Sequence, residues 1–417
     1  MSTKHLTTVL LSLLFFLNGS IAIAQETENY FSITGVVKDS RSKRSVANVT
    51  VSAKGINIGT ITNDDGEFIL KLVEPVTVSE IELSCIGYIN AKISISKDMA
   101  QNQTFFISPQ AFTLSEIEVF SWKNPRDLVE LAMGKVEQNY SSKPNLLTGF
   151  YRETIQKRRN YIHISEAVIQ VYKSTYRQDA NFDRSQVLKG RSLVSPKKSD
   201  TLDVKFLGGP NMPVFLDIVK NPDVVLSKDI LPYYSYKMGE TTSIDDRLQF
   251  VVHFQPQVSM EFPLYHGTLY IDRETYAFTR AEFSMDMSDR LKVTNVILKS
   301  RPTGLRFTPE EVMYVVSYKN SNNKTYLSYI RNEVRFKCDW RRRLFATNYT
   351  IINESIITDY NEDNITRIAA RDAFSMHKSL SQEVSAYYDE DFWGAYNIIE
   401  PTESLENAVG KLKKQLR

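Results

Sequence analysis

The feature that most constrains the fold of this chain is a long succession of short runs in which apolar and polar residues alternate. Val49, Val51 and Ala53 alternate with polar neighbours, and the run from Phe68 to Leu72 repeats the pattern. Successive side chains of a β-strand point to opposite faces, so a period of two is typical of half-buried strands. The sequence therefore predicts a mainly β protein.

The first part of the chain is typical of a β-sandwich, because seven such runs follow one another between Tyr30 and Ile107. Lys54-Gly55 and Asn63–Gly66 supply the residues that tolerate positive φ in tight hairpins. The carboxylates of the second turn look calcium-like, but consecutive polar residues cannot encircle an ion, so we predict a turn. The runs are Ile33–Val37, Val49–Ala53, Ile56–Thr62, Phe68–Leu72, Ile81–Cys85, Ile89–Ile95 and Thr104–Ile107.

Four motifs follow one another in this region: Ile33–Asp39, Val46–Val51, Gly59–Phe68 and Leu83–Tyr88. In this order they resemble the carboxypeptidase-regulatory-like domain found ahead of TonB-dependent receptors. The resemblance implies a transthyretin-like sandwich that serves as an accessory, folding or docking module, and it does not imply peptidase activity. Ser45-Val46 and Asn48 depart from the family pattern, which usually has Pro-Leu and Gly there, and this puts the turn in doubt. Leu114–Val119 also resembles the segment that follows the domain in those receptors.

The pattern changes at Asn124-Pro125, a typical helix opening, after which one apolar stripe continues to Tyr140. Longer alternating runs follow, joined by polar turns such as Asp272–Thr275 and Asn320–Asn323, which favours an antiparallel meander. A sheet of so many strands must curve. We expect an α+β domain with a large curved antiparallel sheet, covered by this helix and by a short segment at Val214–Val219. The predicted strands are Phe150–Ile155, Tyr161–Tyr172, Leu248–Gln255, Tyr265–Asp272, Tyr276–Met285, Glu311–Tyr318, Tyr326–Phe336 and Leu344–Ser355.

Gly267–Asp272, running into Tyr276–Met285, resembles the sheet repeats of periplasmic lipoprotein-carrier proteins. That resemblance implies an apolar cavity between sheet and helix; the alternative is that the concave face is simply filled core. In the tail, the aromatic segment Tyr387–Trp393 is expected to form a strap on the sheet, with a ligand site as the alternative. Ser404–Leu416 reads as an amphipathic helix.

The N-terminal residues predict a signal peptide. Lys4 and His5 lead into an apolar run from Val9 to Leu17, which closes on the cleavage pattern Ala22-Ile23-Ala24. The run is shorter than the roughly 20 apolar residues of a spanning helix, and no later segment is longer, so no transmembrane segment is expected in the mature chain. The expected organisation is signal peptide 1–24, β-sandwich 25–120 and α+β domain 121–417 with the strap and the terminal helix.

Most candidate chemistry is rejected on geometry. His163 and Glu166 match a His-x-x-Glu zinc pair, but they stand in an alternating run, which places residues three apart on opposite faces. Cys85 and Cys338 lie in different predicted domains and read as buried small hydrophobes. Other side chains weighed, none of which gains a catalytic or ligand role, are His253, His266, His377, Asp389 and Asp391.

Charge excludes one class of partner. Lys+Arg total 51 against Asp+Glu 49, so the whole chain gives no reason to expect nucleic acid, although a basic groove formed by the fold is compatible with this balance. Arg341–Arg343 is expected to be a solvated hairpin, with a docking patch for an acidic surface as the alternative.

The sequence thus predicts a non-catalytic protein of a gram-negative envelope, exported to the periplasm or associated with the outer membrane. Its expected role is that of an interaction module or apolar-ligand carrier; the alternative is a carbohydrate-binding accessory of nutrient uptake. The expected partner is a periplasmic or outer-membrane protein, with an apolar ligand or a glycan as alternatives. No catalytic, cofactor-binding or metal-ligating residue is predicted, no cofactor is expected, and the binding residues are unassigned.

Overall fold

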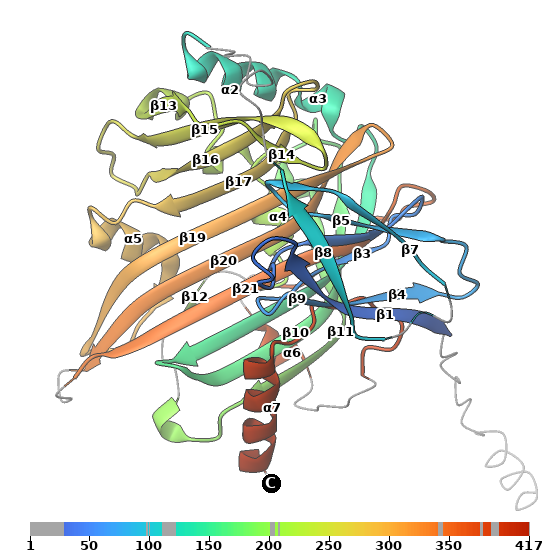
Figure 1. Cartoon of the computed structure of the whole chain (residues 1–417). Coiled ribbons are helices and arrows are strands. Elements are labelled where there is room, and N and C mark those ends of the chain that lie inside the picture. Colours follow the sequence, from blue (N-terminus) through green and yellow to red (C-terminus); the bar gives the residue numbers. More distant parts are fainter. Residues whose placement is uncertain are drawn as a thin grey trace, which may run out of the picture.

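The computed structural model describes residues 29–96, 99, 101–110, 122–200, 205–206, 209–340, 345–375, 378–384 and 392–416 (Figure 1). Within these residues the protein is mainly β, as predicted, and its strands form a small sandwich and one large sheet. Several predictions fall outside the described residues: the signal peptide, Leu114–Val119, Arg341–Arg343, His377, and the part of the aromatic segment that contains Asp389 and Asp391.

The N-terminal sandwich consists of two four-stranded sheets, in the orders β4-β1-β8-β6 and β3-β2-β5-β7. All seven predicted runs are strands, and the run Ile89–Ile95 contributes to two of the eight, because β6 pairs in one sheet and β7 in the other. Val37, Val51 and Leu70 are fully buried between the sheets. The strands are β1 Tyr30–Asp39, β2 Thr50–Ala53, β3 Gly59–Ile61, β4 Glu67–Val73, β5 Glu80–Ser84, β6 Tyr88–Ile89, β7 Ala91–Ser94 and β8 Gln103–Pro109.

The turn in which the sequence departs from the family pattern keeps the required backbone. Asn48 has φ of 59°, the left-handed conformation that glycine adopts most easily and that asparagine tolerates. In the following hairpin, Gly66 has φ of 79°, and a Cβ there would lie 2.8 Å from the carbonyl oxygen of Val37. Asn48, which stands where the family usually has glycine, therefore keeps the backbone conformation of the turn.

The large sheet is antiparallel throughout, and its main path runs β11-β10-β9-β21-β20-β19-β17-β16-β15-β13, with β14 paired to β15. All eight predicted strands are present, and β11, β13 and β14 are additional. β19 and β20 are joined by Asn322 and Asn323, whose φ angles of 50° and 61° fit a two-residue hairpin turn. The strands are β9 Asn145–Lys157, β10 Asn160–Lys173, β11 Arg184–Val194, β13 Tyr234–Met238, β14 Thr242–Ile244, β15 Arg247–Pro256, β16 Tyr265–Asp272, β17 Phe278–Met285, β19 Leu305–Ser321, β20 Lys324–Trp340 and β21 Thr347–Asn361.

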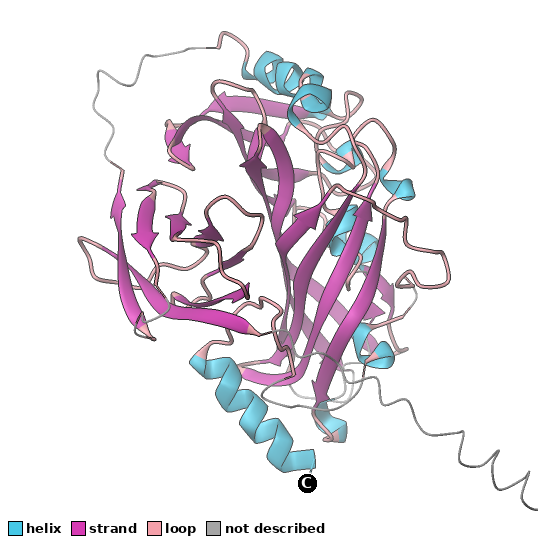
Figure 2. Ribbon diagram, turned by 90° about the vertical axis from the view of Figure 1, so that its right-hand side faces the viewer, coloured by secondary structure: helices cyan, strands magenta, loops and turns pink. Residues whose placement is uncertain are grey.

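Apart from the C-terminal helix, the helices cover one face of this sheet, which we call the helix-side face (Figure 2). The predicted helix is present but is divided at Lys135, and it buries Leu128, Val129 and Ala132 against the sheet. Val214, from the second predicted covering segment, joins the same packed cluster. The helices are α2 Pro125–Gly134, α3 Val136–Asn139, α4 Met212–Phe215, α5 Arg290–Ile297, α6 Leu380–Glu383 and α7 Glu403–Leu416; the 3₁₀ helices are η1 Ala180–Phe182, η2 Lys198–Asp200, η3 Pro222–Val224 and η4 Leu231–Tyr233. A two-stranded sheet pairs β12 Lys205–Phe206 with β18 Leu298–Ser300.

The sandwich lies against the opposite, sandwich-side face, together with residues 392–401, which we call the strap (Figure 2). Trp393 packs edge-on against Phe150 of β9, with ring centroids 5.2 Å apart. The Asn397 amide pairs with the backbone of Lys71 in β4: its oxygen accepts from the amide nitrogen at 2.7 Å and its nitrogen donates to the carbonyl at 2.9 Å. Of the predicted strap Tyr387–Trp393, only Phe392 and Trp393 lie among the described residues, and Trp393 packs on the sheet as expected.

The strap leads into α7, which packs Leu405, Val409 and Leu412 onto Ile164 and Leu193 of the sheet. This confirms the amphipathic helix predicted for Ser404–Leu416. Among the helices of the described residues, none is both long and apolar enough to cross a membrane.

Candidate anion-binding site

The β9–β10 hairpin ends in an unusual turn, Arg158-Arg159. Two-residue hairpin turns favour Gly, Asn or Asp because one or both central residues need positive φ. Here Arg158 has φ of 60°. The tip is held in place, since the amide nitrogen of Arg158 donates to the carbonyl oxygen of Asn348 at 2.8 Å and Ile162 is buried. Two exposed guanidinium groups therefore stand on a fixed support.

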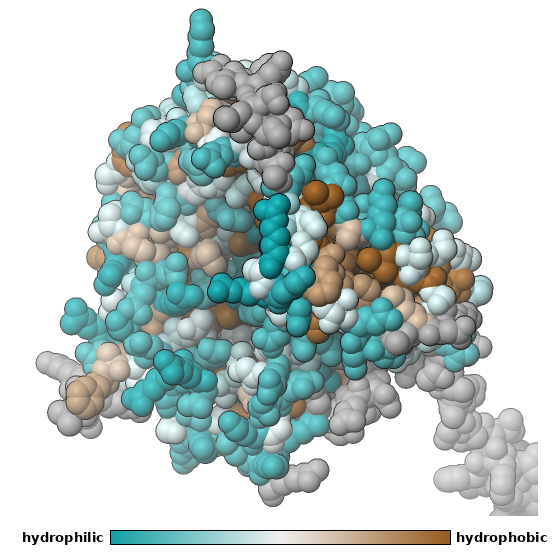
Figure 3. Space-filling view, viewed as in Figure 1, coloured by the Kyte–Doolittle hydropathy of each residue, from teal (hydrophilic) through white to brown (hydrophobic). Residues whose placement is uncertain are grey.

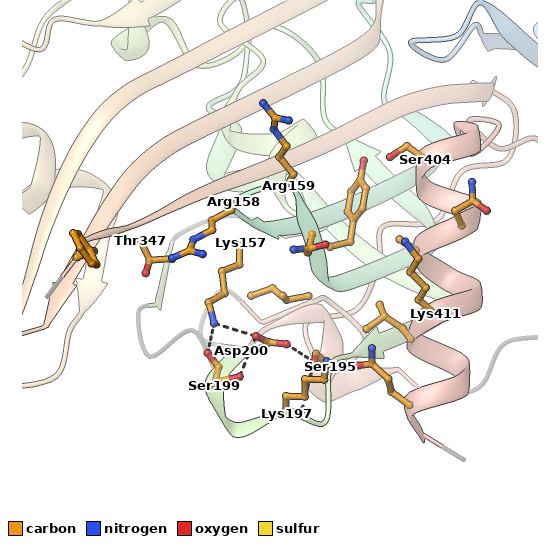
Figure 4. Close-up of a pocket in the computed structure, with 18 residues that line it drawn as sticks. Lys157, Arg158, Arg159, Ser195, Lys197, Ser199, Asp200, Thr347, Ser404 and Lys411 are labelled. Carbon is orange, nitrogen blue, oxygen red and sulfur yellow. Dashed lines mark hydrogen bonds and ion pairs between the residues drawn. The ribbon is translucent and has the colours of Figure 1, made fainter. Parts of the chain in front are cut away.

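A wall opposite this tip is formed by α7, whose apolar side is buried on the sheet. Because Leu412 faces the sheet, the neighbouring Lys411 is exposed and faces the hollow between helix and hairpin (Figure 4). The third side is the segment Ser195–Asp200, which carries the exposed Lys197. Together these elements enclose an open pocket of about 960 Å³.

Among the described residues that line the pocket there is one carboxylate, Asp200, and its charge is already neutralised. Lys157 Nζ lies 3.0 Å from its Oδ1 and also donates to the carbonyl oxygen of Ser199, and Ser195 Oγ donates to its Oδ2 at 2.7 Å. Burial alone would raise the pKa of Asp200, but the hydrogen bonds from Ser195 and Lys157 bring this pKa below its usual value of 3.8. The carboxylate is thus ionised and paired within the wall.

Four cationic side chains then remain: Arg158, Arg159, Lys197 and Lys411. Within the described part of the chain, none of them forms an ion pair with a carboxylate. Guanidinium groups bind phosphate and carboxylate oxygens in a bidentate manner, and ammonium groups act as point charges. Phe345, on the rim, is 77% exposed. The cations of the lining thus make it suited to hold an anionic group.

The sandwich has a family match. Residues 33–119 match the CarboxypepD_reg-like domain. The match covers the motifs and strand order described above and leaves the large sheet, α7 and the pocket outside it. No curated protein matches the chain.

Solved structures show remote similarity to the chain. A putative outer membrane lipoprotein-sorting protein domain from Vibrio parahaemolyticus shares 10% identity over 60% of this chain and 97% of its own, with a TM-score of 0.28. A DUF1329 family protein from Desulfovibrio piger shares 10% identity over 58% and 95%, with a TM-score of 0.25. MucB in complex with MucA(peri) shares 10% identity over 58% and 100%, with a TM-score of 0.19. These TM-scores are too low to assign a function.

The structure separates the two residues of the apparent zinc pair, as predicted. His163 lies on the helix-side face, where its Nε2 is 2.5 Å from Ser165 Oγ and 3.8 Å from Glu153 Oε1. Both contacts use the same ring nitrogen, whereas a serine–histidine–carboxylate relay needs two, and Ser165 is fully buried. Burial lowers the pKa of His163, with Glu153 opposing the shift.

Glu166 points to the sandwich-side face and binds two arginines. Its Oε1 accepts from Arg152 Nε at 2.8 Å and its Oε2 from Arg191 Nε at 2.8 Å, with all three side chains buried. Arg152 also donates to the strap carbonyl of Ile399 at 2.7 Å, and the Arg191 guanidinium lies 4.6 Å from the Trp393 ring centroid. Glu166 therefore anchors the strap that holds the CarboxypepD_reg-like domain.

The remaining candidates also have structural surroundings. His253 shares a hydrogen bond with Thr268, Cys338 is buried, and burial raises the pKa of the half-buried Cys85 to about 11, so this thiol is not activated. Among the described residues, no group of histidine, cysteine and carboxylate side chains is arranged to hold a metal ion.

A buried ionic cluster under the helix-side face was not predicted from the sequence. Lys173 Nζ lies 2.7 Å from Asp217 Oδ2 and 3.6 Å from Asp183 Oδ2, and Lys220 contacts Asp183 at 3.9 Å. Tyr318 donates to Asp217 at 2.8 Å. The cluster ties the segment after α4 to β10, and we assign it a structural role.

Proposed function

We propose that this protein is a non-catalytic binding module of the cell envelope that holds an anionic group in the pocket between the β9–β10 turn, Ser195–Asp200 and α7. The observation that carries the proposal is the set of four cationic side chains around one hollow, where Asp200, the one carboxylate among the described lining residues, is already paired. Unbalanced positive charge on fixed elements raises the free energy of the empty site, and an anion relieves it. The fixed elements are the hairpin bonded to Asn348 and the helix packed on Ile164.

The CarboxypepD_reg-like domain has a positioning role in this proposal. Its turn at Asn63–Gly66 contacts the start of α7: Asn63 Nδ2 donates to the carbonyl oxygen of Pro401 at 3.3 Å, and Asp65 Oδ2 accepts from the amide nitrogen of Glu403 at 3.2 Å. A carboxylate at a helix N-terminus also interacts favourably with the helix dipole. The accessory domain thereby fixes the pocket wall, and we place the division between the two domains at residues 25–120 and 121–417.

Two other roles, an apolar-ligand carrier and a glycan-binding protein, are compared by the side chains found where each ligand would lie. The helix-side face, where an apolar ligand would lie, is occupied by packed side chains that include Tyr140, Phe278 and Leu231, all fully buried. This favours the pocket over an apolar-ligand carrier. Tyr161 and the exposed Phe345 both line the pocket, and aromatic faces suit sugar rings, so an acidic glycan is the second candidate ligand.

The setting is proposed from the N-terminal segment. A signal peptide at 1–24 would deliver the mature chain to the periplasm or to the outer membrane, where phosphorylated and acidic molecules are available. A periplasmic or outer-membrane protein with an acidic surface would meet the same pocket.

Calorimetric titration of the mature chain, residues 25–417, with pyrophosphate and with an oligogalacturonate tests the proposal. The informative variant is Arg158→Gly with Arg159→Asn, because it removes two charges while giving the turn residues that hairpins prefer. The control, Lys228→Asn with Lys237→Asn, removes two exposed charges; Lys237 lies on β13, at the opposite end of the sheet from β11. We expect the turn variant to bind at least about tenfold more weakly and the control to bind as the wild type does. Absence of binding by the wild type, or equal binding by both variants, would refute the proposal.

A further inference from the structure

Phe345 is the most exposed large apolar side chain of the described residues, at 77%, and it stands on the rim of the basic pocket. A solitary exposed apolar residue is ordinary, but one set among cations is the pattern of proteins that lie on lipid bilayers. In Figure 3 the lower part of the molecule is mainly teal, and brown apolar residues gather over the sandwich.

The cations of the pocket come from separate segments that end at the same end of the molecule. Figure 1 shows the β9–β10 turn, η2 and the C-terminal half of α7 in its lower part. Outside the pocket lining, Lys198 of η2 and Lys414 of α7 are also exposed. The basic surface is thus broader than the pocket, which is the arrangement that suits many phosphates lying in one plane.

The helix α7 is acidic at its start and basic at the end that lies beside the other cations. Its first turn carries Glu403 and Glu406, next to the CarboxypepD_reg-like domain, and its last turn carries Lys413 and Lys414. Its 14 residues span roughly 20 Å, so the acidic end is held well away from the basic end. The apolar side is buried on the sheet, which means that α7 presents charge to the surface and does not insert.

From these features we propose that the anionic group is the phosphate of lipid headgroups, and that the end of the molecule carrying the pocket docks on an anionic bilayer, with Phe345 entering the headgroup layer; this rests on the proposed function. A pocket of about 960 Å³ that is open to solvent is far larger than one phosphate ion needs, and an isolated phosphate would leave most of its cations unpaired. A layer of headgroups satisfies all of them together. The sandwich contacts the acidic start of α7 and is thus held away from the end of the molecule that faces the bilayer.

Vesicle sedimentation separates this inference from the function on which it rests. The mature chain is mixed with vesicles of phosphatidylcholine alone or of phosphatidylcholine with phosphatidylglycerol, at low and at high salt, and its affinity for pyrophosphate is measured in parallel. We expect binding to the anionic vesicles only, weakened by salt. Arg158→Gly with Arg159→Asn should lower that binding by about 30-fold, since each cation near an anionic surface contributes about 1 kcal/mol, or about fivefold in affinity.

Phe345→Ser distinguishes the two sources of phosphate. It should weaken vesicle binding by about tenfold and leave pyrophosphate binding unchanged, because only the bilayer offers an apolar layer to the ring. Phe262→Ser, at another exposed phenylalanine, is the matched control and should leave both unchanged. Pyrophosphate binding without preference for anionic vesicles would overturn the bilayer inference alone, as would equal vesicle binding by the two phenylalanine variants. Failure of both probes would overturn the proposed function as well.

Discussion

Replacing Glu166 by glutamine should destabilise the protein more than any substitution in the pocket. The two arginines that bind Glu166 are buried, so in Glu166→Gln two positive charges would remain in the interior with one neutral amide between them. Breaking a buried ion pair by removing one partner costs about 3–5 kcal/mol. The glutamine keeps the size and one acceptor, so we expect a loss of about 3 kcal/mol in the free energy of unfolding.

Urea unfolding followed by circular dichroism measures this loss, with Glu130→Gln as the control. Glu130 accepts from Arg126 Nε at 2.8 Å on the surface of α2, where the two side chains are 44% and 36% exposed, and an exposed pair contributes about 0–1 kcal/mol. Proteolysis should also cleave the strap of Glu166→Gln faster, because Arg152 and Arg191 hold it. If Glu166→Gln and Glu130→Gln unfolded at the same urea concentration, the anchoring role of Glu166 would be wrong.

The remaining predictions concern acidity, the hairpin turn, the buried lysine and the strap. Burial alone would raise the pKa of Glu166, but Arg152 and Arg191 bring this pKa below 4.5. The stabilisation of the fold by ionised Glu166 is therefore present above its unfolded pKa and is lost as the pH falls through its folded pKa. Acid unfolding curves of the wild type and of Glu166→Gln should converge below that folded pKa. Arg158→Gly should raise the melting temperature, by relieving about 1 kcal/mol of left-handed strain, whereas Arg159→Gly should not. Burial lowers the pKa of Lys220 from 10.5 to about 8, so between these pH values the unfolded state binds a proton that the folded state has lost. The free energy of unfolding of the wild type should therefore rise by up to about 2 kcal/mol between pH 8 and pH 10. Lys220→Met should show no such rise. Asn397→Ala should cost about 2 kcal/mol in calorimetric unfolding, because the amide and carbonyl of Lys71 lose their partner; a cost near zero would mean that water replaces it.

The strand framework was accessible from the sequence because period-two alternation reports burial on one face. The same rule explains why β11 was missed: Arg184–Val194 carries Lys189, Gly190 and Arg191 where a strand is expected to alternate. Its Arg191 is nevertheless buried, since Glu166 across the strand pair neutralises it. Local propensity could not show this, because the partner that makes a buried arginine tolerable comes from another strand.

The pocket could not be predicted from the sequence for a related reason. Arg158-Arg159, Lys197-Lys198 and Lys411 each stand in a segment that reads as a solvated turn or a solvated helix face, and the nearly balanced total charge conceals them. Only the fold brings residues more than 200 positions apart to one hollow. One local signal was present: a hairpin turn made of two arginines lacks the residues that such turns favour, and this marked the tip as a place where charge was retained against backbone preference.

The turn at Asn63–Gly66 connects the two parts of the molecule in a way that neither suggests alone. In the sequence its carboxylates looked calcium-like, but its spacing predicted a tight turn; in the structure its side chains bond to Pro401 and Glu403, where the strap becomes α7. The strap is held from the other side by Arg152, whose guanidinium reaches the carbonyl of Ile399. The start of α7 is therefore fixed from both the CarboxypepD_reg-like domain and the large sheet. Because α7 is also the wall that presents Lys411 to the pocket, a domain with no residue in the site still determines where one of its four cations lies.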